Sequence, residues 1–283
     1  MPADRTCEPV LLLLPGMTLN ATVFPDLGFA TVSPDFTRLV VSPDGCNEEL
    51  RRKRMGFYCD LLLEELRRSD AWASGWPRIV VGHSFGGMLA LEWLTARSAD
   101  PLARIDGLVL VATTAGPMFD AARLLVGRLL GRELRVPVKP LVRLWNHPGL
   151  TRFLARILSR NGRLEYVDFR RLEFRSDFRV GLAGWINTDW RARRSFRIAM
   201  EGFDVRERLK NLDIPTMVLH GTRDTYFTVR VAEELARGIP GARLRLIDGA
   251  AHLLPLTHPD AVEKAVRELV EISLNRKRST PTP

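Results

Sequence analysis

The residues with the clearest chemical meaning surround Ser84, in the stretch Gly82-His83-Ser84-Phe85-Gly86-Gly87. The apolar run 78–81 precedes this G-x-S-x-G pattern, and a helix-like stretch follows it. A buried strand, a sharp turn and a helix would lift the Ser84 hydroxyl out of a sheet. Because such a turn brings backbone segments close together, its flanks must be small, and Gly82 and Gly86 meet that need. A serine held there is a nucleophile when a histidine can take its proton. The alternative is a glycine-rich turn that happens to contain a serine.

Two later loops carry the side chains that this chemistry requires. The apolar stretch 216–219 leads into a loop with Asp224, and the stretch 244–247 leads into a loop with His252. Strand ends at one edge of a parallel sheet bring such loops together. We therefore expect His252 to accept the proton of Ser84 and later deliver it to the leaving group. Asp224 would fix the tautomer of the imidazole and stabilise its protonated form.

The other histidines and acids are predicted to play structural parts. Asp248 is the main rival for the acid, but it ends the same strand that feeds His252, so Asp224 is preferred. The remaining candidates are assigned to packing, helix entry or the surface: His83, His147, His220, His258, Asp106 and Asp204.

Short apolar runs alternate with helical stretches along most of the chain. Because most of the runs are continuously apolar, they are typical of a parallel sheet covered on both faces. The predicted strands are 10–14, 38–41, 78–81, 108–112, 216–219 and 244–247. The predicted helices are 51–68, 87–97, 229–237 and 260–274. This order predicts an α/β fold with a doubly wound, mostly parallel sheet.

The alternation stops between about residues 116 and 209. The amphipathic pieces 121–130, 150–158, 166–174 and 188–203 lie in that segment, which reads as an inserted helical cap. The predicted domains are a core in two parts, residues 1–115 and 210–274, a cap over 116–209, and a disordered tail over 275–283.

With these motifs in their order, the chain resembles the α/β-hydrolase superfamily, in particular its serine-nucleophile esterases and thioesterases with a helical cap. The resemblance covers residues 9–115 and 209–274. Two stretches, 15–21 and 250–252, are similar to the carboxylesterases that demethylate pimeloyl-carrier-protein methyl ester.

The resemblance also implies an oxyanion hole made of the backbone N–H groups of Met17 and Phe85. Gly16 would allow the backbone to approach the substrate closely. The turn after the first strand carries Pro15 where the family commonly has histidine. This change affects side-chain hydrogen bonds of the loop but not the amides of the hole.

The net charge of +9 comes from the predicted cap. Residues 117–210 hold 21 of the 42 Lys and Arg residues but only 10 of the 33 acids. The arginines, including Arg170, Arg171 and those in 191–197, form either a solvated helix face or a rim that attracts an anionic acyl carrier or a substrate carboxylate. The aromatic residues that either wall an acyl pocket or form the cap's own core are Trp145, Phe153, Trp185, Trp190 and Phe196.

Several classes of function are disfavoured. The chain has no motif that enters a nucleic-acid groove, no G-x-x-x-x-G-K-[ST] loop and no set of metal ligands, so neither nucleic acid, cofactor nor metal is expected. The longest apolar run near the start, 10–14, is too short to span a bilayer, and the first residues lack the layout of a signal peptide. We therefore expect a cytoplasmic protein with no transmembrane segment. The three cysteines form no disulfide framework.

These observations predict a serine hydrolase that cleaves a small-molecule carboxylic ester or thioester through an acyl-enzyme on Ser84. Hydrolysis of an amide or C–C bond, and acyl transfer to an alcohol, would use the same groups. A hydrolase-fold protein that binds a ligand or partner through its basic cap without catalysis is the alternative from another class.

Overall fold

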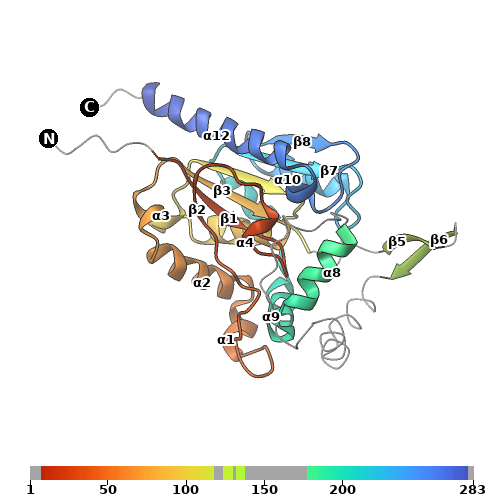
Figure 1. Cartoon of the computed structure of the whole chain (residues 1–283). Coiled ribbons are helices and arrows are strands. Elements are labelled where there is room, and N and C mark those ends of the chain that lie inside the picture. Colours follow the sequence, from red (N-terminus) through yellow and green to blue (C-terminus); the bar gives the residue numbers. More distant parts are fainter. Residues whose placement is uncertain (1–7, 118–123, 130–131, 138–176, 280–283) are drawn as a thin grey trace.

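A six-stranded parallel sheet lies at the centre of the chain in a computed structural model that describes residues 8–117, 124–129, 132–137 and 177–279 (Figure 1). Its strands stand in the order β2-β1-β3-β4-β7-β8, and every pair is parallel. Their bounds are β1 Val10–Leu14, β2 Ala30–Val32, β3 Arg78–His83, β4 Gly107–Val111, β7 Thr216–Gly221 and β8 Arg243–Ile247. The predicted α/β fold class is therefore confirmed.

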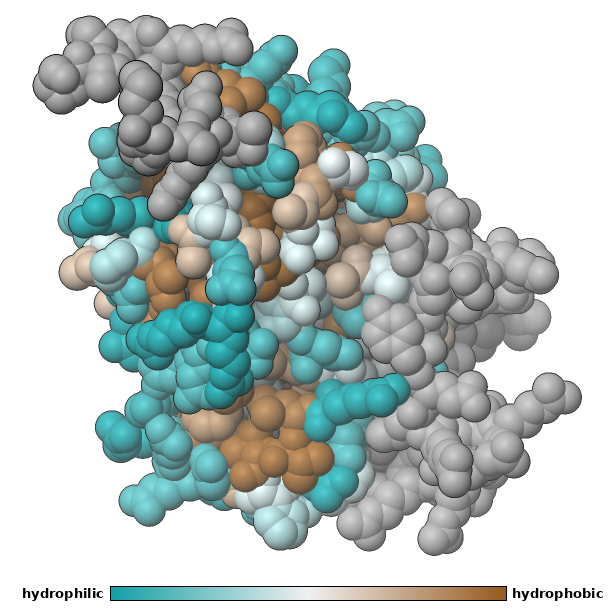
Figure 2. All heavy atoms as spheres, turned by 60° about the vertical axis from the view of Figure 1, so that its left-hand side comes forward, coloured by the Kyte–Doolittle hydropathy of each residue, from teal (hydrophilic) through white to brown (hydrophobic). Residues whose placement is uncertain are grey.

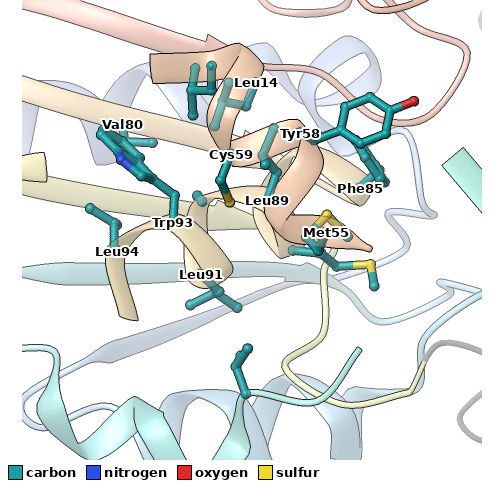
Figure 3. Packing of buried hydrophobic residues seen from close by; sticks show 14 of the residues in the cluster. Leu14, Met55, Tyr58, Cys59, Val80, Phe85, Leu89, Leu91, Trp93 and Leu94 are labelled. Carbon is teal, nitrogen blue, oxygen red and sulfur yellow. The ribbon is translucent and has the colours of Figure 1, made fainter. Parts of the chain in front are cut away.

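Helices cover both faces of the sheet, and this explains the apolar strands. Alternate residues of a strand point to opposite faces. Leu12 belongs to one core with residues of α2 (Met55–Arg67), α4 (Phe85–Ala96) and α10 (Val229–Gly238). Leu11 belongs to a second core with residues of α12 (Pro259–Ser279), which lies on the other side of the sheet (Figure 1). Figure 3 shows part of the first core, where Tyr58, Phe85 and Trp93 pack between α2, α4 and the sheet.

Outside the inserted segment, the helices agree with the sequence prediction in place but differ at their ends. The predicted helix 51–68 is two helices, α1 Glu48–Lys53 and α2, because Arg54 between them adopts a φ of 55°. The remaining elements are the helices α3 Asp70–Ser74 and α11 Leu254–Thr257 and the 3₁₀ helices η1 Ala21–Val23, η2 Pro101–Ala103 and η4 Arg206–Asn211.

The predicted strand 38–41 is wrong. The edge strand is β2, which lies earlier in the chain and pairs with β1 from Val10↔Ala30 to Leu12↔Val32. Leu39 and Val41 instead pack against the first core from a loop. Leu39 and Val41 are therefore partly buried without strand pairing, while Val40 between them is exposed.

The inserted segment is only partly helical. Helices α8 Asp177–Asn187 and α9 Trp190–Met200 fit the predicted helical cap. The predicted helix 121–130 is wrong, because β5 Leu124–Leu129 pairs with β6 Arg132–Pro137 in an antiparallel hairpin. Gly127 lowers the helix propensity of this stretch, and cross-strand pairing satisfies its backbone groups. The predicted helices 150–158 and 166–174 lie outside the described residues, and the domain limits stay predictions.

The last helix is longer than expected. α12 continues to Ser279, so residues 275–279 of the predicted disordered tail are helical, while 280–283 lie outside the described residues. None of the described helices combines the length and the apolar character needed to cross a bilayer. On the face shown in Figure 2, hydrophilic residues cover much of the described surface and hydrophobic residues gather in separate patches.

Candidate active site

Ser84 sits in a sharp turn between β3 and α4. Its φ of 51° and ψ of −116° are unusual for a residue with a side chain. The turn is fixed on both sides, because the Ser84 N–H donates to the carbonyl of Val111 at 3.0 Å and its carbonyl accepts from the Thr113 hydroxyl at 2.7 Å. Ser84 is 9% exposed, so its hydroxyl stands at the boundary of the core.

Glycine is required on both sides of this turn. A Cβ atom at position 82 would lie 2.7 Å from the Cα atom of Gly87, and one at position 86 would overlap the carbonyl oxygen of Leu14. Both obstacles are backbone atoms, which cannot move aside as a flexible side chain can. The close approach also brings the loop after β1 against the first turn of α4.

The structure brings Ser84, His252 and Asp224 into one chain of hydrogen bonds. Nε2 of His252 lies 3.0 Å from Oγ of Ser84, and Nδ1 of His252 lies 2.8 Å from Oδ2 of Asp224. The three residues follow β3, β8 and β7 respectively, so all of them stand at the carboxyl edge of the sheet. This arrangement can pass a proton from the serine hydroxyl to the imidazole while the carboxylate balances the charge.

The carboxylate of Asp224 is held by its own loop. Its Oδ1 atom accepts the N–H groups of Tyr226 at 2.8 Å and Phe227 at 3.1 Å, and its side chain has no exposed surface. Burial acts to raise the pKa of Asp224, but the attraction of His252 and these hydrogen bonds outweigh it, so the pKa lies below its ordinary value. Asp224 is therefore ionised beside His252 at neutral pH.

Met17 and Phe85, the predicted oxyanion residues, lie on the two segments that meet at the turn. Phe85 is the first residue of α4, a position whose amide has no acceptor within the helix. Met17 lies in the loop after β1, where the Leu19 N–H donates to the Gly16 carbonyl at 3.0 Å. Gly16 lies against the ring of His83, since a Cβ atom there would be 3.0 Å from Nδ1 of that histidine.

Two further histidines support the site, and sequence reasoning did not find their contacts. His83 is fully buried, and its Nε2–H donates to the carbonyl of His252 at 2.9 Å. Burial lowers the pKa of His83 to about 3, so the ring is neutral at physiological pH. His220 donates to the carbonyl of Phe227 at 3.0 Å and lies 4.0 Å from Oδ2 of Asp224. Only the position of each histidine at the end of a strand hinted at these roles.

The other candidates have local partners elsewhere. Oδ1 of Asp248 accepts from the Thr222 hydroxyl at 3.1 Å, and Nδ1 of His258 lies 2.9 Å from the hydroxyl of Thr257. Asp106 accepts from Trp76 and from the backbone of Arg78, while Asp204 pairs with Arg206. His147 lies outside the described residues.

Aromatic side chains surround the three residues. The ring centroid of Tyr226 lies 4.5 Å from that of His252, and Tyr226 is 41% exposed. From α9, the ring of Phe196 packs 4.8 Å from that of Phe85, so the inserted segment reaches the turn. Trp185 is also buried, whereas Trp190 is partly exposed and Trp145 and Phe153 lie outside the described residues.

Most of the described cap arginines have acidic partners. Arg191 pairs with Asp189 at 2.6 Å, Arg197 pairs with Glu201 at 2.8 Å, and Arg194 lies 3.7 Å from Asp44. Arg170 and Arg171 lie outside the described residues. In the described ranges, no cluster of three or more His, Cys, Asp or Glu side chains has the arrangement of a metal site.

The chain belongs to the alpha/beta hydrolase family, whose profile matches residues 11–265. Among curated proteins, it is 34% identical over 73 residues to a pimeloyl-[acyl-carrier protein] methyl ester esterase of Neisseria meningitidis; the match covers 26% of this chain and 28% of that protein. It is also 41% identical over 76 residues to the polyketide synthase ThaQ of Burkholderia thailandensis, a match that covers 27% of this chain and 4% of that protein. The chain thus spans less than a third of the length of either relative.

Solved structures share the fold. The esterase RhEst1 from Rhodococcus sp. ECU1013 superimposes with a TM-score of 0.60, is 17% identical, and covers 95% of this chain and 92% of its own. At that identity, the likeness concerns the fold alone. With the family match, it makes this protein an α/β hydrolase.

Proposed function

We propose that this protein is a serine hydrolase that cleaves a carboxylic ester or thioester through an acyl-enzyme on Ser84. The observation that carries the proposal is the hydrogen-bond chain from Ser84 through His252 to the buried carboxylate of Asp224. A serine in a strained turn beside a histidine that a carboxylate orients has the arrangement of an activated nucleophile.

In the first half of the proposed reaction, Oγ of Ser84 attacks the carbonyl carbon and its proton moves to Nε2 of His252. The carbonyl oxygen becomes an oxyanion, which accepts hydrogen bonds from the N–H groups of Met17 and Phe85. The bond to the leaving group then breaks, and the proton on Nε2 passes to the departing oxygen or sulfur. The acyl group remains on Ser84.

In the second half, a water molecule takes the place of the leaving group. His252 accepts one of its protons as the water oxygen attacks the acyl carbon, and the same proton returns to Oγ of Ser84 when the acid leaves. Asp224 keeps its charge throughout and balances the protonated imidazole. No cofactor enters any of these steps.

We also propose that an anionic carrier presents the acyl substrate to the enzyme. The partial likeness to an esterase that acts on a methyl ester of an acyl-carrier protein supports an acyl substrate presented by an anionic carrier. Cap arginines such as Arg194, which is partly exposed, would contribute to a positive rim for that carrier. We further propose a cytoplasmic protein with no nucleic-acid partner.

A fluorophosphonate probe tests the nucleophile directly, because it phosphonylates an activated serine and leaves a covalent mark. We expect labelling of the wild-type protein at Ser84 and none of Ser84→Ala. The matched control is Ser74→Ala, which removes an exposed serine of α3 and should label like the wild type. A folded wild-type protein that stays unlabelled and hydrolyses no ester would favour the non-catalytic binding protein.

The bond cleaved is tested by turnover. Matched oxygen esters, acyl-CoA thioesters, anilides and a C–C-cleavage substrate should rank with the esters or thioesters first. An added alcohol as second substrate measures acyl transfer. A preference for anilides or C–C bonds would replace the ester proposal while keeping the same three residues.

A further inference from the structure

Arg193 is a buried cation without an anion. It is only 3% exposed, and its Nε and Nη1 atoms, which carry three N–H bonds, have no hydrogen-bond partner. Burial lowers the pKa of Arg193 to about 10, so the side chain stays protonated at neutral pH. A buried charge with unused donors is unfavourable in a folded protein unless another function requires it.

The neighbouring carboxylate does not neutralise it. Asp189 is the acid whose charge attracts the Arg193 guanidinium. Both of its carboxylate oxygens, however, accept hydrogen bonds from Arg191, Oδ1 from Nε at 2.9 Å and Oδ2 from Nη2 at 2.6 Å. Within the part of the chain that the structure describes, no ion pair involves Arg193. Its guanidinium instead lies over the ring of Trp185, 4.1 Å from the centroid. Such stacking fixes the guanidinium plane and uses none of its N–H groups.

Arg193 lies on a helix that packs against one of the proposed oxyanion residues. On α9 it lies one turn before Phe196, whose ring packs 4.8 Å from that of Phe85. Its stacking partner, Trp185, belongs to α8. The adjacent residue Gly184 lies against Thr18, the residue after Met17, because a Cβ atom at position 184 would be 2.5 Å from the Thr18 carbonyl oxygen. The helices that carry Arg193 and Trp185, α9 and α8, therefore contact the segments of Phe85 and Met17 respectively.

The geometry points to Arg193 as the binding residue for a free carboxylate in the acyl part of the substrate. The preferred substrates are then half-esters or half-thioesters of dicarboxylic acids. This inference rests on the proposed hydrolase function and narrows its substrate class. The acyl side is favoured because α8 and α9 contact the segments whose amides would hold the acyl oxygen, whereas the leaving group must reach His252.

One positive charge suits one carboxylate. The other described arginines of α9 are engaged by acids: Arg191 by Asp189, Arg194 by Asp44 and Arg197 by Glu201. A phosphate dianion would require a second unengaged cation, which no other described residue of α9 supplies. A neutral acyl chain would leave the N–H groups of Arg193 without an acceptor.

The first experiment compares two substrates on the same enzyme. Monomethyl half-esters and dimethyl diesters of straight-chain dicarboxylic acids, matched in length, are offered to the wild-type protein. We expect kcat/KM for the best half-ester to exceed that for its diester at least about tenfold. Arg193→Met should reduce this ratio to about one, and Arg193→Lys should retain part of it. Arg197→Met, on the same helix, is the matched control and should keep the wild-type ratio.

A second measurement keeps the test independent of variants that fail to fold and of turnover. Calorimetry on wild type and on Ser84→Ala compares the monoamide of each dicarboxylic acid, which keeps one carboxylate, with the diamide, which has none. Tighter binding of the monoamide, by about tenfold or more, supports the inference even if no ester is turned over. Equal binding, together with diesters cleaved as well as half-esters at every length, overturns it. Failure of the hydrolase proposal appears separately, as absence of fluorophosphonate labelling and of turnover with either ester.

Discussion

The ring of His83 is hydrogen-bonded to the main chain of His252: its Nε2–H donates to the carbonyl oxygen at 2.9 Å, in a fully buried setting. The residue before the proposed nucleophile thus holds the loop of the proposed base. This contact is separate from the 3.0 Å contact between Ser84 and His252 themselves. Because the carbonyl oxygen can only accept, the neutral ring carries its one hydrogen on Nε2.

Replacing His83 by Phe should slow the reaction without unfolding the site. The change keeps a buried ring but removes the donor, so the His252 loop loses one constraint. We expect kcat to fall about tenfold with little change in KM, since small losses of orientation reduce the chemical step. His83→Gln, which restores an N–H donor, should recover part of the loss. Steady-state kinetics with an ester that the wild type cleaves checks both, and equal kcat in all three proteins would contradict the positioning role.

The buried His83 also predicts acid sensitivity. Its pKa is about 3 in the folded state against an ordinary 6.5, so the unfolded chain binds a proton that the native protein does not in the window between. As pH falls through that window, this group lowers the free energy of unfolding by about 1.4 kcal/mol per pH unit. The lowered pKa values of His220 and Asp224 act in the same direction.

Urea denaturation between pH 7 and pH 4 measures this effect. The free energy of unfolding of His83→Phe should depend less steeply on pH than that of the wild type, because the other groups contribute equally to both. Parallel curves would show that His83 does not carry the acid sensitivity.

Asp224→Asn should leave the fold intact and remove most of the activity. The amide offers its NH₂ or its oxygen to Nδ1 of His252 without a charge, so the imidazolium that forms in the reaction is no longer stabilised. We expect kcat to fall by about 10³–10⁴. Asp248→Asn is the matched control, because Asp248 bonds to Thr222 and not to His252. If the two variants lost activity equally, Asp224 would not be the acid of the site.

Ser84→Gly should be more stable than Ser84→Ala, although neither has a nucleophile. Ser84 has a φ of 51°, which glycine adopts without strain and alanine does not. The expected difference in the free energy of unfolding is about 1 kcal/mol in favour of glycine. At Glu271, an exposed position inside α12, the same pair of substitutions should rank in the opposite order, with alanine more stable. Thermal unfolding of the four variants decides between these rankings.

Local sequence was sufficient for the residues of the site and for most of the sheet. The apolar runs of β1, β3, β4 and β7 predict strands because strands buried on both faces leave that signature, while β8, at the edge of the sheet, alternates apolar residues with arginine. Ser84, Asp224 and His252 were selected because each follows such a run. Their catalytic roles remain proposals, but their convergence is a property of the structure.

Local sequence was insufficient to predict secondary structure where the apolar pattern of a segment had another cause. Leu39 and Val41 are apolar because a loop packs on the core, and the apolar spacing of 121–130 suits a helix but pairs as β5 with β6. In both places a long-range contact decided the conformation, and such contacts leave no periodicity in the segment itself.

The order of motifs along the chain determined the fold class, the turn at Ser84 and the choice of Asp224 and His252 as the proposed acid and base, because each depends on a strand and the few residues that follow it. Only the tertiary structure decided that His83 holds the His252 loop and that Arg193 is buried over Trp185 without an acid. Those relationships join residues that are distant in sequence or belong to different helices. Whether a charge is paired depends on what the packed chain places beside it, and that is fixed only when the helices meet.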